Sequence, residues 1–189
     1  VSRFIALNEF CKSKFVAGGL PAERIEVKPN FVDWVPEPRW DQRRGGVYVG
    51  RLSEEKGVEV LMSAMRLHPE HCVEVIGAGP FEAEMREVAG AAYKGGQPFP
   101  LIMERLSSAA YLLLPSVCYE GFPRTLVEAF ASGVPVIASR HGSLAELVDD
   151  GRTGLLFEPG NAAELVDRLK WADAHPQEML AMGRAARKE

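Results

Sequence analysis

Tyr111–Gly133 reads YLLLPSVCYEGFPRTLVEAFASG, and this stretch decides the fold class of the 189-residue chain. Its first four residues form a continuous apolar run, which is typical of a strand buried on both faces. A polar loop follows, and Pro123 then stands where the first turn of a helix accepts a residue without an N–H group. The stretch therefore predicts a strand, a loop and a helix, the unit from which parallel α/β sheets are built.

Two carboxylates flank the start of this predicted helix. Glu120 lies in the loop and Glu128 lies about one turn into the helix, with seven residues between them. Carboxylates accept hydrogen bonds from sugar hydroxyls, and free N–H groups at a helix start favour phosphate. The pair indicates a site for a polyhydroxylated anion. Alternatively, the two groups are a loop charge and a helix-dipole partner, each contributing only about 0.3–1 kcal/mol.

The rest of the chain repeats the alternation of strand and helix. Strands are expected at Phe4–Leu7, Arg24–Lys28, Val47–Val49, Cys72–Ile76, Ala110–Leu114 and Val134–Ala138. Helices are expected at Lys56–Leu67, Phe81–Ala89, Leu101–Ser108, Arg124–Ser132, Ser143–Val148, Ala162–Ala174 and Pro176–Arg187. The pattern predicts an α/β fold, a Rossmann-like parallel sheet with helices on both faces and ligand-binding loops at the carboxyl ends of the strands.

Pro29–Gly46 interrupts this rhythm, since it has prolines, tryptophans and no clean periodicity. We therefore expect residues 1–45 to lead into a main domain formed by residues 46–189. The chain begins with Val1 and enters a strand-like run at once, so we expect it to be a piece of a longer protein.

Composition excludes several classes of protein. The net charge of −4 argues against a nucleic-acid surface, and no apolar run approaches the length of a membrane span. The three cysteines are odd in number, which predicts reduced thiols and a cytoplasmic location. Neither the cysteines nor His68, His71 and His175 have metal-ligand spacing, so no metal site is expected.

A cationic motif, Val49–Gly57, joins another strand end to a helix start. Gly50 follows the strand, and Arg51 and Lys56 can both face a ligand above it. Two fixed cations would neutralise a diphosphate, and charge-assisted hydrogen bonds contribute roughly 1.5–3 kcal/mol each. The alternative is a solvated surface pair with Glu54 and Glu55.

Two further motifs have both a functional and a structural interpretation. Gly77-Ala78-Gly79-Pro80 would let the backbone approach a ligand, but a tight turn explains it equally well. Ser143 and Glu146 have the spacing of a helix capping box, which needs no function. His141 could be a base, although most loop histidines are surface groups.

Taken together, the motifs resemble the carboxyl-terminal half of a retaining glycosyltransferase with the GT-B fold, of the large family 4. The resemblance runs from about Asn30 to the end, and Ser2–Lys28 fits the crossing from the family's other half. It rests on these segments: Pro29–Asp33, Gly50–Leu52, Lys56–Gly57, Gly77–Pro80, Leu114–Ser116, Glu120, Glu128, Ala131–Val136 and Gly151–Phe157. Pro123 and Arg124 depart from it, because they replace a common small apolar pair.

The resemblance implies a role for each matching position. Arg51 and Lys56 would hold the donor diphosphate and stabilise the leaving group, Glu120 would contact the donor sugar, and Glu128 would bind the ribose. Backbone groups would meet the sugar and phosphate at Gly50, Gly121, Phe122, Pro123, Thr125 and Leu126. The base would lie near Gln97–Phe99.

The resemblance also implies an activity and its partners. The parent enzyme would transfer a sugar from a UDP-, GDP- or ADP-sugar without a metal cofactor, and an acceptor-binding N-terminal domain would be missing here. This chain alone would bind the nucleotide without catalysis, and the parent protein could associate with a membrane. Alternatives are a nucleotide-sugar epimerase or phosphorylase-like enzyme of the same architecture, or a non-catalytic nucleotide-binding module.

Overall fold

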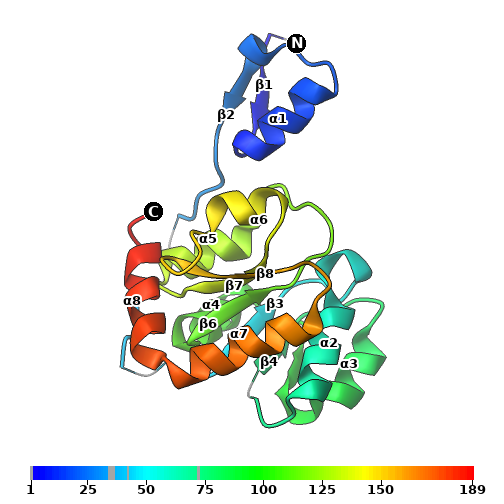
Figure 1. Ribbon diagram of the computed structural model, residues 1–189, viewed down its shortest axis with the longest axis vertical. Coiled ribbons are helices and arrows are strands. Elements are labelled where there is room, and N and C mark those ends of the chain that lie inside the picture. The colour runs from blue at the N-terminus through cyan, green and yellow to red at the C-terminus, as the bar shows by residue number, and fades with distance from the viewer. Residues whose placement is uncertain (1, 34–36, 42, 72) are drawn as a thin grey trace.

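A six-stranded parallel sheet forms the centre of the molecule (Figure 1). The structure is a computed structural model that describes residues 2–33, 37–41, 43–71 and 73–189. In spatial order the strands are β5 (Tyr93–Gly95), β4 (Val73–Ile76), β3 (Gly46–Val49), β6 (Tyr111–Leu114), β7 (Val136–Ser139) and β8 (Gly154–Phe157). This confirms the predicted Rossmann-like α/β fold.

Helices cover both faces of the sheet because each strand alternates its apolar side chains between them. In β6, Tyr111 and Leu113 belong to one hydrophobic cluster, whereas Leu112 and Leu114 belong to the other. The first cluster is completed by α2 (Val58–Leu67), α3 (Glu82–Ala89), α7 (Ala162–Ala174) and α8 (Pro176–Ala186). The second is completed mainly by α4 (Phe99–Ser108), α5 (Arg124–Ala131) and α6 (Gly142–Leu147).

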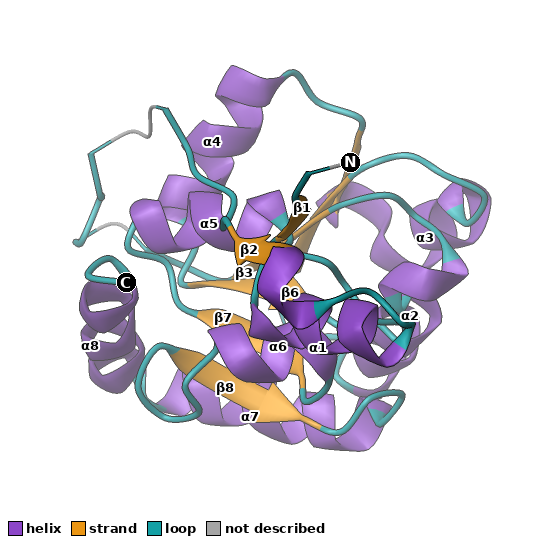
Figure 2. Ribbon diagram, turned by 90° about the horizontal axis from the view of Figure 1, so that it is seen from above, coloured by secondary structure: helices purple, strands orange, loops and turns teal. Residues whose placement is uncertain are grey.

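The first part of the chain forms a separate small unit. Strands β1 (Phe4–Ala6) and β2 (Ile25–Val27) pair in parallel, and α1 (Glu9–Ala17) and the short helix η1 (Ala22–Arg24) lie between them in the sequence. Figures 1 and 2 show this unit beyond the main sheet, with α1 close to α6.

Two strands and one α-helix, besides the short 3₁₀ helices, were not expected from the sequence. Strand β5 has only the residues YKG, which give no apolar run. Strand β8 (GLLF) follows the turn at Gly151 and was considered only as part of the Gly151–Phe157 segment. Helix α1 buries none of its residues, so it has no apolar face to reveal it. Cys72, the expected start of β4, and residues 34–36 and 42 of the expected connector lie outside the described residues. No helix in the described ranges is long and apolar enough to cross a membrane.

The order of the strands fixes where a ligand would bind. After β3 the chain continues to β4 and β5 on one side, and then crosses to β6 on the other side of β3. Open parallel sheets bind ligands at such a switch point, beyond the carboxyl ends of the strands. The loops after β3 and β6 are the two that carry the predicted cationic and acidic motifs.

Candidate functional site

A cavity of about 230 Å³ lies at this switch point. Of the predicted site residues it is lined by Gly50, Arg51, Lys56, Glu120, Pro123 and Thr125. Other residues also line it, among them Tyr48, Ser116 and Arg124. The structure thus brings residues of both predicted motifs into one cavity.

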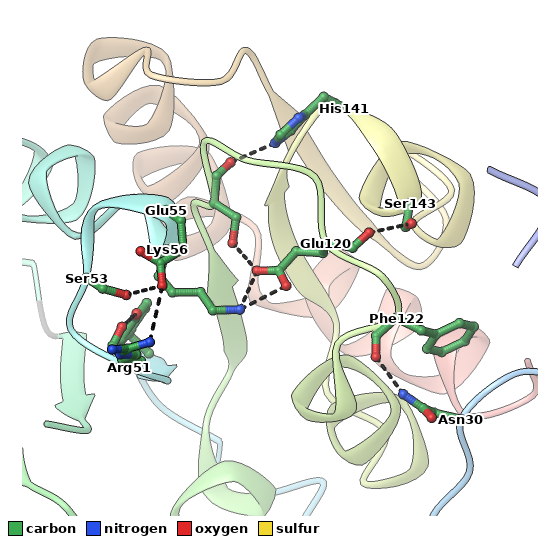
Figure 3. Close-up of polar contacts among 11 residues, drawn as sticks. Asn30, Arg51, Ser53, Glu55, Lys56, Glu120, Phe122, His141 and Ser143 are labelled. Atoms are coloured by element: carbon green, nitrogen blue, oxygen red, sulfur yellow. Dashed lines mark hydrogen bonds and ion pairs between the residues drawn. The ribbon is translucent and has the colours of Figure 1, made fainter. Parts of the chain in front are cut away.

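An ion pair between Lys56 and Glu120 joins the two loops (Figure 3). Lys56 Nζ donates to both carboxylate oxygens of Glu120, at 2.7 and 2.8 Å. Ser116 Oγ donates to the same carboxylate at 2.6 Å, and the Glu120 side chain is only 15% exposed. The ion partner of Lys56 is therefore the predicted sugar-binding carboxylate, and neither Glu54 nor Glu55.

Gly57 is what allows the two loops to approach so closely. The short helix η2 (Glu54–Lys56) ends at Gly57, whose φ is +67°, so α2 begins at Val58 instead of the expected Lys56. A Cβ atom on Gly57 would lie 1.8 Å from the Pro115 carbonyl oxygen. Only glycine combines this conformation with this contact.

Arg51 occupies the more open side of the cavity. The buried Tyr48 hydroxyl donates to the Arg51 carbonyl oxygen at 2.7 Å and so fixes the backbone there. Burial, together with the Glu120 and Glu55 carboxylates, raises the pKa of Tyr48, which keeps this donor protonated. The Arg51 guanidinium is 68% exposed and lies 3.9 Å from Glu55, so it has freedom to turn toward a ligand.

Glu55 in turn is held by its own loop. Ser53 Oγ donates to Glu55 Oε1 at 2.6 Å, and this hydrogen bond lowers the pKa of Glu55. Arg51 thus forms the expected surface ion pair with Glu55, whereas Lys56 pairs with Glu120 in the cavity.

The loop after β6 is held from its outer side. Its carbonyl oxygens accept hydrogen bonds from four side chains, at 2.7–2.8 Å: Asn8 to Gly121, Asn30 to Phe122, Ser143 to Glu120 and His141 to Ser116. Figure 3 shows the last three of these contacts around the loop. Gly121 and Phe122 therefore direct their carbonyls away from the cavity, and neither of them lines it.

Two predicted residues of α5 also lie outside the cavity. Leu126 is buried in the second hydrophobic cluster, and its N–H donates to the Pro123 carbonyl oxygen at 3.1 Å. Glu128 is only 5% exposed, and its nearest charged partner is Arg124, at 3.9 Å. The structure therefore groups Glu120 with Lys56 and does not place Glu128 beside it.

Replacing Glu128 with glutamine should stabilise the fold at neutral pH. Burial raises the pKa of Glu128, although Arg124 opposes this effect. A raised folded-state pKa means that wild-type stability falls as pH rises from the unfolded value of about 4.3 through the folded one. Urea denaturation should show that Glu128→Gln unfolds less readily at pH 7, with the advantage shrinking toward pH 4. Glu87→Gln, on the exposed side of α3, is the control, and an equal gain in that variant would contradict the prediction.

Two structural interpretations can now be judged. The expected capping box is wrong: Ser143 donates to Glu120, and the Glu146 carboxylate accepts from the N–H groups of Glu9 and Phe10 at the start of α1. The glycine turn serves packing, because a Cβ on Gly77 would lie 1.8 Å from the Gly50 carbonyl oxygen.

No pattern in the sequence indicates the residues that support the loop after β6. Asn8 and Asn30 act from 113 and 92 residues away, and single polar side chains have no periodic signal. Ser116 and Ser143 belong to motifs whose sequence does not indicate a contact with Glu120. Their positions could be found only once the neighbours of β6 were known.

The cavity combines one partly buried cation–carboxylate pair, two exposed arginines and the first turn of α5. The backbone N–H groups of such a turn point outward and favour anions. Fold and site together define a Rossmann-like domain with a charged cavity at its switch point, which is the place where this class of domain binds ligands.

Comparison with known proteins identifies the family. The chain belongs to the glycosyl transferases group 1, whose family model matches residues 39–189. It corresponds to the C-terminal half of a GT-B glycosyltransferase, as the resemblance in sequence motifs implied.

Several curated relatives are similar to this chain. Lipopolysaccharide 1,6-galactosyltransferase of Salmonella typhimurium is 32% identical over 182 residues, covering 87% of this chain and 50% of that protein. Sulfoquinovosyl transferase SQD2 of Arabidopsis thaliana is 30% identical over 149 residues, covering 76% of this chain and 29% of that protein. The chain thus spans half or less of these relatives.

Solved structures show the same fold. HepE of Anabaena, in complex with UDP-glucose, matches 100% of this chain and 58% of its own with a TM-score of 0.85 at 22% identity. The lipopolysaccharide outer core galactosyltransferase WaaB matches 99% of this chain and 58% of its own with a TM-score of 0.75 at 26% identity.

Proposed function

We propose that this chain is the donor-binding half of a retaining glycosyltransferase that takes its sugar from a nucleoside diphosphate sugar. The observation that carries the proposal is the Lys56–Glu120 pair in the cavity at the switch point. The family assignment supports sugar transfer, and the complex of HepE with UDP-glucose supports a nucleotide sugar as the donor.

Lys56 and Arg51 would hold the diphosphate. Both line the cavity, and the first turn of α5 faces the same space. When the glycosidic bond breaks, negative charge develops on the leaving diphosphate. Fixed positive groups stabilise that charge in a partly dehydrated site, and they need no metal ion to do so.

Glu120 would accept hydrogen bonds from hydroxyls of the donor sugar. Ser116 and Lys56 already hold its carboxylate, so its position is set before the ligand arrives. Preorganisation of this kind lowers the entropy lost on binding. Glu128 would bind the ribose once Arg124 moves aside, and the base would lie near Gln97–Phe99.

The test is binding of nucleoside diphosphates by calorimetry. We expect the 189-residue chain to bind one of UDP, GDP and ADP but to transfer no sugar, because closure with a second domain completes GT-B sites. The full-length protein should transfer the sugar, and NMR of the product should show retention at the anomeric carbon. No binding of any of the three by the folded chain would contradict the proposal, whereas binding without transfer by the full-length protein would indicate a non-catalytic module. An epimerised free nucleotide sugar would indicate an epimerase.

Reversing the charge of Arg51 should weaken binding of the nucleoside diphosphate. Arg51→Glu removes an attraction and adds a repulsion, but exposure of the side chain screens both. We therefore expect a loss of about tenfold, equal to about 1.4 kcal/mol. Arg66→Glu, on the exposed side of α2, is the matched control. Equal affinities of the Arg51 variant and the wild type would exclude a phosphate role for Arg51.

A further inference from the structure

Two histidines and a carboxylate lie close together at the end of the main sheet where the strands begin. His68 follows α2, His71 lies in the loop before β4, and Asp173 is in the last turn of α7. One ligand atom from each residue lies within 4.8 Å of the other two. Because this loop precedes β4, the cluster sits at the amino ends of the strands, opposite the donor cavity.

The ring of His71 is the most constrained member of the cluster. Its side chain is 3% exposed, and its Nδ1 atom lies 2.6 Å from Asp173 Oδ2. Among the described residues, however, this buried nitrogen has no partner in hydrogen-bond geometry. An imidazole nitrogen and a carboxylate oxygen are both ligands that zinc accepts, and here the two atoms lie in direct contact.

The other nitrogen of His71 faces the Tyr111 hydroxyl at the start of β6. Histidines that bind metals donate their second ring N–H to an oxygen atom, which fixes the ring and its tautomer.

We propose that His68, His71 and Asp173 bind one divalent transition-metal ion, with zinc the best match. Two imidazoles and a carboxylate form a donor set that zinc accepts, with a water molecule completing a tetrahedral shell. Zinc–ligand distances of about 2.0–2.2 Å require the cluster to contract. The Asp173 side chain is 49% exposed and has room to move. Glu70, 3.1 Å from His68 Nδ1, could replace the water.

The metal would join the loop between α2 and β4 to the end of α7. It would therefore have a structural role, far from the donor cavity. The expectation of no metal site was based on the spacing of the histidines in sequence. That spacing could not reveal Asp173, which the fold brings from another helix.

Zinc binding should be measured by equilibrium dialysis at pH 7. Three cysteines could bind zinc on their own, so the wild type is compared with a Cys11→Ser/Cys72→Ser/Cys118→Ser variant. We expect one zinc ion per chain in both. In the serine background, His68→Gln and Asp173→Asn should each lower the affinity at least about 100-fold, since even second-shell changes lower it about 10–100-fold. Asp173 is 49% exposed and His68 is 12% exposed, and circular dichroism checks that both variants fold.

His175→Gln is the matched control, because His175 stacks on Trp171 outside the cluster. It should bind zinc as the wild type does. Zinc should also raise the Tm of the wild type and the His175 variant but not that of Asp173→Asn. Failure of the wild type to bind zinc, loss of binding in the serine variant, or unchanged affinity in both His68→Gln and Asp173→Asn would overturn the proposal. None of these outcomes depends on the donor site.

Discussion

Replacing Lys56 with alanine should lower the affinity for a nucleoside diphosphate by about 100-fold, and transfer by the full-length enzyme should fall at least as much. Two losses act in the same direction. A charge-assisted contact to phosphate, worth about 1.5–3 kcal/mol, disappears. The Glu120 carboxylate, which is 15% exposed, also loses its counter-ion and would repel the diphosphate. Calorimetry measures the affinity, and steady-state kinetics of the full-length protein measure the transfer.

Three variants make this prediction specific. Lys170→Ala, on the exposed side of α7, removes a lysine outside the cavity and should leave the affinity unchanged. Lys56→Arg should retain much of it, because the charge remains. In a Lys56→Ala/Glu120→Gln variant the repulsion is gone, so nucleoside diphosphate binding should partly recover. An affinity within threefold of wild type for Lys56→Ala, on the order of 0.6 kcal/mol, would contradict the role proposed for Lys56.

Replacing Gly57 with alanine should lower the free energy of unfolding by about 2–5 kcal/mol and also abolish donor binding. The left-handed conformation at φ +67° costs a residue with a Cβ about 1–2 kcal/mol. The new Cβ would meet the Pro115 carbonyl oxygen at 1.8 Å, and relieving such overpacking typically costs about 1–3 kcal/mol more. The two loops would separate, and Lys56 would move away from Glu120.

Gly160→Ala separates the cost of the left-handed conformation from the cost of the contact with Pro115. Gly160 has φ +80°, but a Cβ there would meet no atom within 4 Å. This variant should therefore show only the conformational loss and should keep its affinity for the nucleotide. Urea denaturation of both variants gives the difference between their free energies of unfolding. If Gly57→Ala and Gly160→Ala lost the same stability, the contact with Pro115 would contribute nothing.

The sequence predicted that the cationic and acidic loops would meet, because both loops follow strands, and six of the predicted residues line one cavity. Arg51 comes two residues after the end of β3, and Glu120 lies in the loop after β6. The carboxyl ends of parallel strands share one edge of a sheet. Any order that placed these two strands side by side would bring their loops together. The pairing of Lys56 with Glu120 could not be predicted from the sequence, because it depends on the turn at Gly57.

Other features depend on packing that no local pattern encodes. Glu128 is 5% exposed, and its place about one turn into a helix did not reveal that burial. Strand β5 and helix α1 lack the periodic apolar residues by which such elements are detected. The contacts of Asp173 with His71 and of Asn8 with Gly121 join distant parts of the chain, so they appear only in the folded structure.

The hydrogen bonds from Asn8 and Asn30 to the loop after β6 have a mechanical consequence. The first thirty residues cannot shift relative to the sheet without either breaking these bonds or pulling the loop with them. Glu120 lies in the same loop and lines the cavity at the switch point, so a shift of the chain's first segment would also move that wall of the cavity. A fragment that began at residue 39, where the family match begins, would lose this restraint. In that fragment the loop after β6 would keep the hydrogen bonds from His141 and Ser143 but lose those from Asn8 and Asn30.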